Sequence, residues 1–175
     1  MVNTRLEETG QKPISPNSHQ WYRIGEKCEL AFIDKMSAVG FDCIINPDKK
    51  VNKKMPDLYV NGRLADLKTQ LTHFYSSGKH YSIHPTKVVT INHKDVHYYS
   101  TCYPDLDIYI WLYKQGLERK EIILPSMDEV WFVHIQTLLK LCETAPTHSY
   151  SYRRDATGQA KCSYVLSTDN FIRII

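Results

Sequence analysis

The chain has 175 residues, of which 42% are hydrophobic and 23% charged, with 7 glycines and 8 prolines. This composition excludes a disordered, collagen-like or low-complexity chain, because it supplies enough apolar side chains to bury a core. No apolar run approaches the roughly 20 residues of a membrane helix, and no signal-peptide stretch opens the sequence, so we expect a cytoplasmic protein without membrane contact. The formal net charge of +3 permits a nucleic-acid partner without identifying one.

The first part of the chain divides into a leader, a helix and a lysine-rich loop. Residues 1–17 have no periodicity, so we expect a flexible leader ahead of a single domain over residues 18–175. From Ser18, apolar residues recur at helical spacing, which predicts an amphipathic helix that ends at Gly40. Residues 41–45 predict a short strand. The loop after it, which is either simply solvated or a binding surface, carries Lys49, Lys50, Lys53 and Lys54.

The clearest local signal is the dipeptide Asn61-Gly62 between two apolar-rich runs. A type I′ turn needs positive φ at both central residues, and Asn-Gly accommodates this conformation better than other pairs. The sequence therefore predicts a two-stranded hairpin with these residues as its loop. In that register Asp57 faces Asp66, and the alternation of side chains along a strand places Lys68 on the same face.

The rest of the chain predicts a mixed α/β domain. We expect strands at residues 87–91, 106–113 and 130–133, helices at 92–99 and 136–143, a hairpin across 149–165 and an edge strand at 170–175. Together with the first helix, these elements predict an α/β fold in which helices flank a central mixed β-sheet and the N-terminal helix comes first.

Paired acidic residues make the hairpin a candidate chemical site. Two carboxylates that face each other across a ladder repel, so a purely structural hairpin is expected to avoid the pair Asp57 and Asp66. A divalent cation between them reverses that repulsion, and carboxylate oxygens suit Mg²⁺ or Mn²⁺. Lys68 brings a donor to the same place, and Glu29 lies at the border of the helix's apolar stripe, from which it can reach the site. The alternative is an exposed salt-bridge cluster of little energetic weight.

The order of these residues resembles the PD-(D/E)XK nuclease superfamily. In that pattern a helix supplies a glutamate, here Glu29, and a hairpin supplies Pro56-Asp57 and then Asp66-Leu67-Lys68. Gln70 matches a glutamine often found just after the motif lysine. The stretch from Gly25 to Phe41 is also similar to the first helix of archaeal Holliday-junction resolvases and related restriction-type enzymes. The resemblance covers about residues 25–70.

The resemblance implies a restriction-endonuclease-like core and Mg²⁺-dependent hydrolysis of phosphodiester bonds in nucleic acid, with DNA as the expected substrate and Mn²⁺ as an alternative cation. Asp57, Asp66 and Glu29 would bind the metal. Together with Lys68, which would orient water or stabilise the transition state, they would form the catalytic set.

The resemblance also implies contacts to the substrate and to other chains. Gln70 and the four lysines of the loop would contact the nucleic acid. Independently of the resemblance, the segment with Tyr152, Arg153 and Arg154 is either a second substrate patch, in which the ring stacks on a base, or part of a strand with half-buried aromatic residues. The chain has no room for a separate recognition domain, so we expect a homodimer or a partner protein. A phage or mobile-element origin fits such a minimal nuclease.

Other readings remain open at this point. A non-catalytic nucleic-acid-binding or interaction module could retain the nuclease fold, and a separation of more than about 10 Å between Glu29 and the aspartate pair would favour it, because ligation fails at that distance. Zinc is not expected, since the eight histidines form no His-Glu-x-x-His motif and no cysteine lies at ligand spacing. No glycine-rich phosphate loop occurs.

Overall fold

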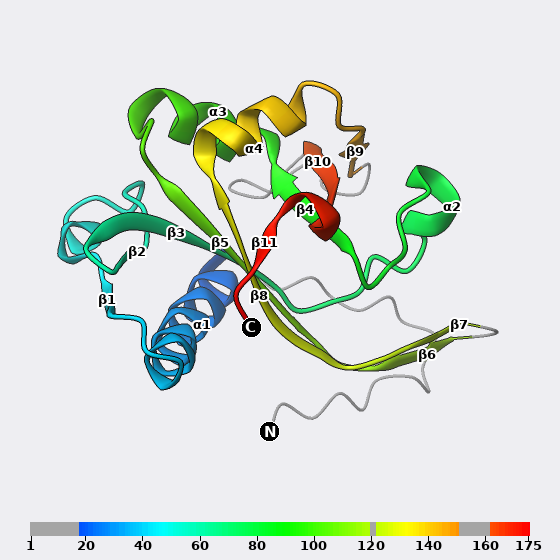
Figure 1. The fold of residues 1–175 in the computed structure, drawn as a ribbon, viewed down its shortest axis with the longest axis horizontal. Helices are drawn as coiled ribbons and strands as arrows, with labels where there is room; N and C mark the ends of the chain where they lie inside the picture. Colours follow the sequence, from blue (N-terminus) through cyan, green and yellow to red (C-terminus); the bar gives the residue numbers. More distant parts are fainter. Residues whose placement is uncertain (1–17, 120–121, 151–161) are drawn as a thin grey trace.

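The structure is a computed structural model that describes residues 18–119, 122–150 and 162–175. The predicted leader and the predicted patch at Tyr152, Arg153 and Arg154 lie outside the described residues. The described part is a mixed α/β fold in which a six-stranded sheet carries helices on both faces (Figure 1). Within these ranges, no helix combines the length and the apolar character that crossing a membrane requires.

The first helix and the loop after it agree with the sequence pattern. Helix α1 spans Ser18–Ala38, and Gly40 follows it with a φ of 89°, a left-handed conformation that favours glycine. The backbone N–H of Phe41 donates to the carbonyl of Met36, 3.0 Å away, and so closes the helix end. The short strand β1 covers Cys43–Ile45, and the lysine loop begins with a 3-10 helix, η1, at Pro47–Lys50.

The predicted hairpin is confirmed. Strand β2 spans Leu58–Val60 and strand β3 spans Arg63–Gln70, and they pair antiparallel in the predicted register, with Val60 opposite Arg63. Asn61 and Gly62 have φ values of 48° and 75°, as a type I′ turn requires. Strand β3 runs beyond its partner β2, and from Ala65 to Gln70 its other edge pairs in parallel with β5, Asp107–Lys114.

The central sheet has the order β1-β2-β3-β5-β8-β11, in which β8 spans Met127–His134 and β11 spans Ile172–Arg173. Only the pair β3 and β5 is parallel, so the sheet is mixed, as predicted. Strand β11 lies at the edge of this sheet and confirms the predicted C-terminal edge strand.

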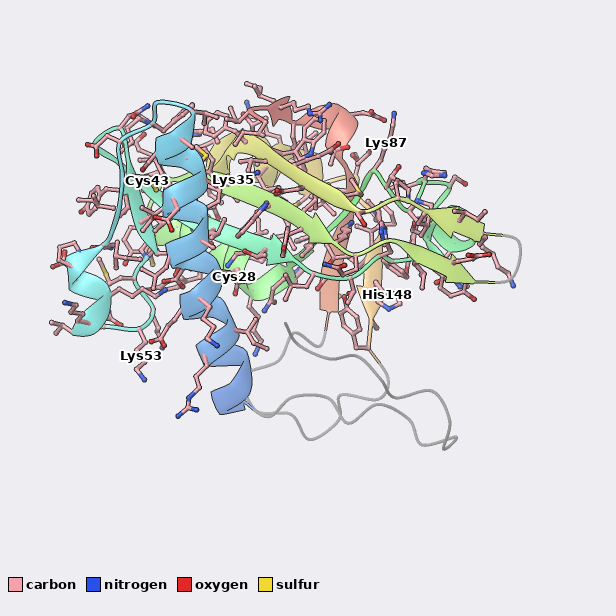
Figure 2. The ribbon with its side chains drawn as sticks, turned by 90° about the horizontal axis from the view of Figure 1, so that it is seen from below. Cys28, Lys35, Cys43, Lys53, Lys87 and His148 are labelled. Atoms are coloured by element: carbon pink, nitrogen blue, oxygen red, sulfur yellow. The ribbon has the colours of Figure 1, made fainter. Side chains whose placement is uncertain are left out.

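Two hydrophobic cores lie on the two faces of the sheet. On one face, Phe32 of α1 packs against Tyr109 and Trp111 of β5, with ring centroids 5.8 and 6.1 Å away, and α1 crosses the strands of the sheet (Figure 2). On the other face, Ile108 and Ile110 of β5 pack beneath helices α3, His93–Cys102, and α4, Ile135–Cys142. The same core includes a second sheet, formed by β4 (Val88–Asn92), β10 (Cys162–Ser167) and β9 (Thr147–Ser149).

Several short elements carry no sequence signal that predicts them. These are α2 (Ser77–Tyr81), β6 (Leu117–Arg119), β7 (Ile122–Leu124) and the 3-10 helix η2 (Thr168–Asn170). Each is at most five residues long, which is too short for hydrophobic periodicity to develop. The flanks of the predicted hairpin at residues 149–165 do pair, as β9 with β10.

The turn of the hairpin can be tested with two glycines in different conformations. We expect Gly62→Ala to lower the free energy of unfolding by about 1–2 kcal/mol, because alanine is strained at positive φ. Gly25→Ala serves as the control, since Gly25 lies within α1 with open space where its side chain would be added. It should raise stability by about 0.5–1 kcal/mol. Urea unfolding measures both, and a neutral Gly62→Ala would contradict the type I′ turn.

Candidate active site

Two of the predicted acidic residues meet around a lysine from the loop. Lys49 Nζ lies 2.5 Å from Glu29 Oε1 and 2.5 Å from Asp57 Oδ1. Glu29 Oε1 and Asp57 Oδ1 are therefore separated by no more than twice 2.5 Å. This is well below the separation of about 10 Å above which Glu29 could not share a metal site with the aspartates. The three side chains are only 12–17% exposed, so solvent screens their charges weakly.

A buried asparagine holds this lysine in place. The Asn46 side chain is fully buried, and its Nδ2 donates to the carbonyl of Pro56 at 2.8 Å. Its backbone N–H donates to the carbonyl of Asp57 at 2.9 Å, while its Oδ1 accepts from the N–H of Asp48 and caps η1. Asn46 thus ties the turn that carries Lys49 to the segment that carries Asp57. The sequence Asn-Pro-Asp signals a turn at this position, but it does not predict that Asn46 binds the segment before β2.

The second half of the site is built on β3 and α3. Asp66 is 1% exposed, and its Oδ1 accepts a hydrogen bond from Tyr99 Oη at 2.7 Å. Lys68 Nζ lies 2.8 Å from Asp66 Oδ2 and 2.9 Å from Asp95 Oδ2, and 5.2 Å from the centre of the Tyr99 ring. Asp66 Oδ2 is nevertheless buried without a hydrogen bond of acceptable direction, because the ammonium group is close but poorly aligned.

The two halves meet through the backbone of β3. The N–H of Leu67 donates to Asp57 Oδ2 at 3.2 Å, although Asp57 lies just before β2 and the ladder ends at the pair of Leu58 and Ala65. The direct pairing of Asp57 with Asp66 is thus replaced by a contact one residue further along β3. Across both halves, four carboxylates face two ammonium groups, which leaves two uncompensated negative charges.

Burial and neighbouring charges shift the protonation equilibria of the site. Burial raises the pKa of Asp66, and the charge of Asp57 adds to this effect against the attraction of Lys68. Burial and Asp57 likewise raise the pKa of Glu29. Burial alone would lower the pKa values of Lys49 and Lys68, but their carboxylate partners outweigh it, and both values are raised. Both lysines therefore remain positively charged at neutral pH.

The donor set fits a hard divalent cation. Glu29, Asp57 and Asp66 offer only oxygen atoms, and Asp66 Oδ2 has the Lys68 ammonium group 2.8 Å away but accepts no hydrogen bond, so it could also bind a cation. Within the described residues, however, no three His, Cys, Asp or Glu side chains are grouped closely enough to hold an ion as they stand. The ammonium group of Lys49 lies between two of the carboxylates instead.

The other predicted site residues are more scattered. Lys50, Lys53 and Lys54 are exposed on the loop, and Gln70 Nε2 donates to the carbonyl of Thr90 at 2.9 Å. Their substrate contacts stay predictions. Asp95 and Tyr99 are not among the predicted site residues, because residues 92–99 predict a helix but nothing in the sequence places that helix over β3.

Comparisons with known proteins concern the fold. No family model and no curated protein sequence matches the chain. A Holliday junction resolvase, Hjc, from the archaeal hyperthermophile Archaeoglobus fulgidus is similar in structure, with 12% identity, a TM-score of 0.41 and coverage of 85% of this chain and 93% of that chain. A nuclease from a fusselovirus is similar with 14% identity, a TM-score of 0.44 and coverage of 93% and 90%.

The bond between Tyr99 and Asp66 can be tested by removing one hydroxyl group. We expect Tyr99→Phe to lower the free energy of unfolding by about 1–3 kcal/mol, because it leaves a buried carboxylate oxygen without its donor. Tyr113→Phe is the control, since Tyr113 is largely exposed and keeps its ring. Thermal and urea unfolding measure both variants, and equal losses would mean that the Tyr99 hydroxyl does not support Asp66.

Proposed function

We propose that the protein is a metal-dependent endonuclease that hydrolyses phosphodiester bonds in nucleic acid, with DNA as the expected substrate. One observation carries this proposal: residues from three separate elements converge in one connected acidic site. Glu29 comes from α1, Asp57 from the start of the hairpin, and Asp66 with Lys68 from β3. An exposed salt-bridge cluster would not bury Asp66 beside a second carboxylate, because burying surplus charge costs free energy.

The site's charge also favours this function over a module that only binds nucleic acid. An acidic site repels phosphate unless a cation is bound, so such a module would gain nothing from the buried carboxylates. A catalyst needs them as metal ligands, and Glu29, Asp57 and Asp66 would hold Mg²⁺ or Mn²⁺ here. When bound, such an ion would polarise a phosphate oxygen and lower the pKa of a water molecule.

The chain's own residues supply the remaining functions. Lys68 stays protonated, so it is a donor and a fixed positive charge rather than a general base. Asp66 and Asp95 hold its ammonium group from two sides, which sets the position from which it would orient water or stabilise the developing charge. The exposed lysines of the loop would bind phosphates further along the strand. A homodimer or a partner protein would supply further recognition.

Cleavage of nucleic acid tests this function directly. With Mg²⁺ or Mn²⁺, the wild type should cleave at least one of a panel of plasmid, single-stranded, duplex or branched DNA and RNA substrates. Asp66→Asn and Lys68→Met should each lower the rate at least about 100-fold, because each removes a group that acts in the transition state.

A matched pair on the surface controls for the loss of charge. Lys87 and Asp169 form an exposed ion pair at 2.8 Å, so Lys87→Met and Asp169→Asn should leave the rate unchanged. Equal cleavage by the wild type and both site variants would refute the assignment of the site, and a wild type that cleaves no substrate would refute the activity.

Metal binding tests the position of Lys49. A cation held by both Glu29 and Asp57 must displace the Lys49 ammonium group from between them. We therefore expect Lys49→Met to bind Mn²⁺ about tenfold more tightly, since the competing charge is gone. The same change should lower stability without metal, because it leaves paired carboxylates exposed to each other. Calorimetric titration measures the affinity, and the neighbouring exposed Lys50→Met is the control. Weaker binding by Lys49→Met would show that the lysine assists the metal instead.

A further inference from the structure

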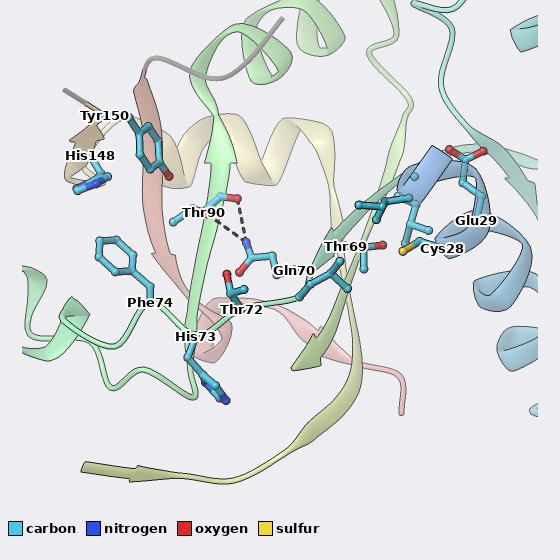
Figure 3. Close-up of a pocket in the computed structure, with 14 residues that line it drawn as sticks. Cys28, Glu29, Thr69, Gln70, Thr72, His73, Phe74, Thr90, His148 and Tyr150 are labelled. Atoms are coloured by element: carbon cyan, nitrogen blue, oxygen red, sulfur yellow. Dashed lines mark hydrogen bonds between the residues drawn. The ribbon is translucent and has the colours of Figure 1, made fainter. Parts of the chain in front are cut away.

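A cavity of about 470 Å³ adjoins the candidate active site, and its walls come from both sides of β3 (Figure 3). At one end lie Cys28 and Glu29 of α1, and Glu29 also belongs to the acidic site. At the other end lie the rings of Phe74, His148 and Tyr150. The cavity therefore shares Glu29 with the candidate active site.

The lining has the chemistry of a site for an uncharged, flat molecule. It combines the three aromatic rings with the hydroxyl groups of three threonines and the amide of Gln70. Among the described residues that line it there is no lysine or arginine, and Glu29 is the single acid, so the lining offers a phosphate group neither of the side chains that usually bind it. Aromatic walls with a few neutral donors and acceptors suit a nucleobase, which stacks and offers hydrogen bonds at its edges.

Ring packing and hydrogen bonds hold the walls of the cavity in place. Phe74 packs against His148 with ring centroids 4.9 Å apart and against Tyr81 at 5.8 Å. The Tyr81 hydroxyl and His148 Nδ1 share a hydrogen bond of 2.7 Å, which links α2 to β9 although Tyr81 does not line the cavity. Gln70 donates to Thr90, which fixes its amide, and its oxygen is turned away from Thr90 (Figure 3). A wall fixed in advance binds its ligand at a smaller entropic cost.

We propose that this cavity receives an unstacked base of the nucleic acid, from a nucleotide close to the reacting phosphate. The inference rests on the proposed function and deepens it. Gln70 lies four positions beyond Asp66 on β3, a distance of about 13 Å at the rise of a strand. The base therefore belongs to a neighbouring nucleotide rather than to the reacting one. A base can enter only if it leaves the helical stack, so the substrate is unpaired or distorted at that position.

Oligonucleotides with a single missing base test the proposal on the full-length wild type. The abasic position is moved one nucleotide at a time across the cleavage site, and binding is measured by fluorescence anisotropy with Ca²⁺ in place of Mg²⁺ to prevent hydrolysis. One position near the cleavage site should weaken binding on the order of tenfold, as the loss of one stacked base predicts. Equal binding at every position would overturn the proposal.

Two variants connect that position to the cavity. Phe74→Ala should weaken binding of the intact oligonucleotide about tenfold, because it removes the ring on which the base stacks. It should leave binding of the abasic oligonucleotide unchanged, because that oligonucleotide has already lost the same contact. Thr72→Trp should act alike by filling the cavity from an exposed position, without removing a packed ring. Thr101→Trp, on an exposed part of α3, is the control. An equal loss on intact and abasic oligonucleotides would place the effect outside the cavity and overturn the proposal.

The outcomes separate this inference from the proposed function. If no substrate is cleaved, the abasic scan runs across the whole oligonucleotide, and binding alone decides whether a base is recognised. If cleavage occurs without dependence on any base, the proposed nuclease activity stands and the assignment of the cavity fails.

Free nucleoside monophosphates should compete with the oligonucleotide only at millimolar concentrations, since they lack the contacts of the strand. Competition at micromolar concentrations would identify a free nucleotide as the ligand and overturn the assignment to the substrate.

Discussion

The backbone conformation of two residues fixes the arrangement of the candidate site. Asn61 and Gly62 both adopt positive φ, and this turn sets which residues of β2 and β3 face each other. A slip by one residue would turn Asp66 and Lys68 towards the apolar face under α1, where Ala65 now packs. The parallel pairing of β3 with β5 then holds the strand rigid beyond the hairpin, so the site rests on a strand of the central sheet rather than on a loop.

The charges of the site oppose folding, and the fold partly offsets them. Asp66 is buried with a raised pKa, which means that its charged form is less favourable in the folded chain than in water. Tyr99 and Lys68 each stabilise one of its oxygens, and Lys49 lies between the two other acids. Such unfavourable burial is typical of sites kept for function rather than for stability.

The sequence predicts those features that neighbouring residues determine, and it does not predict those that depend on contacts between segments far apart in the chain. The α1 helix and the hairpin follow from local periodicity and turn chemistry, and the position of Glu29 follows from the border of an apolar stripe. Contacts between distant segments leave no such trace. The hydrogen bond from Asn46 to the carbonyl of Pro56 depends on the path of the loop, and the hydrogen bond from Tyr99 to Asp66 depends on how α3 packs. The lysine loop predicts positive charge but not that Lys49 turns inward.

The inward position of Lys49 also affects how far the acidic pair depends on a bound cation. The Lys49 ammonium group lies between Glu29 and Asp57, so the positive charge that faces these two acids is covalently part of the chain. Structural zinc domains unfold when a chelator removes their ion. Here the acidic pair keeps a tethered ammonium group that no chelator removes, so the repulsion between Glu29 and Asp57 is reduced whether or not a cation is present.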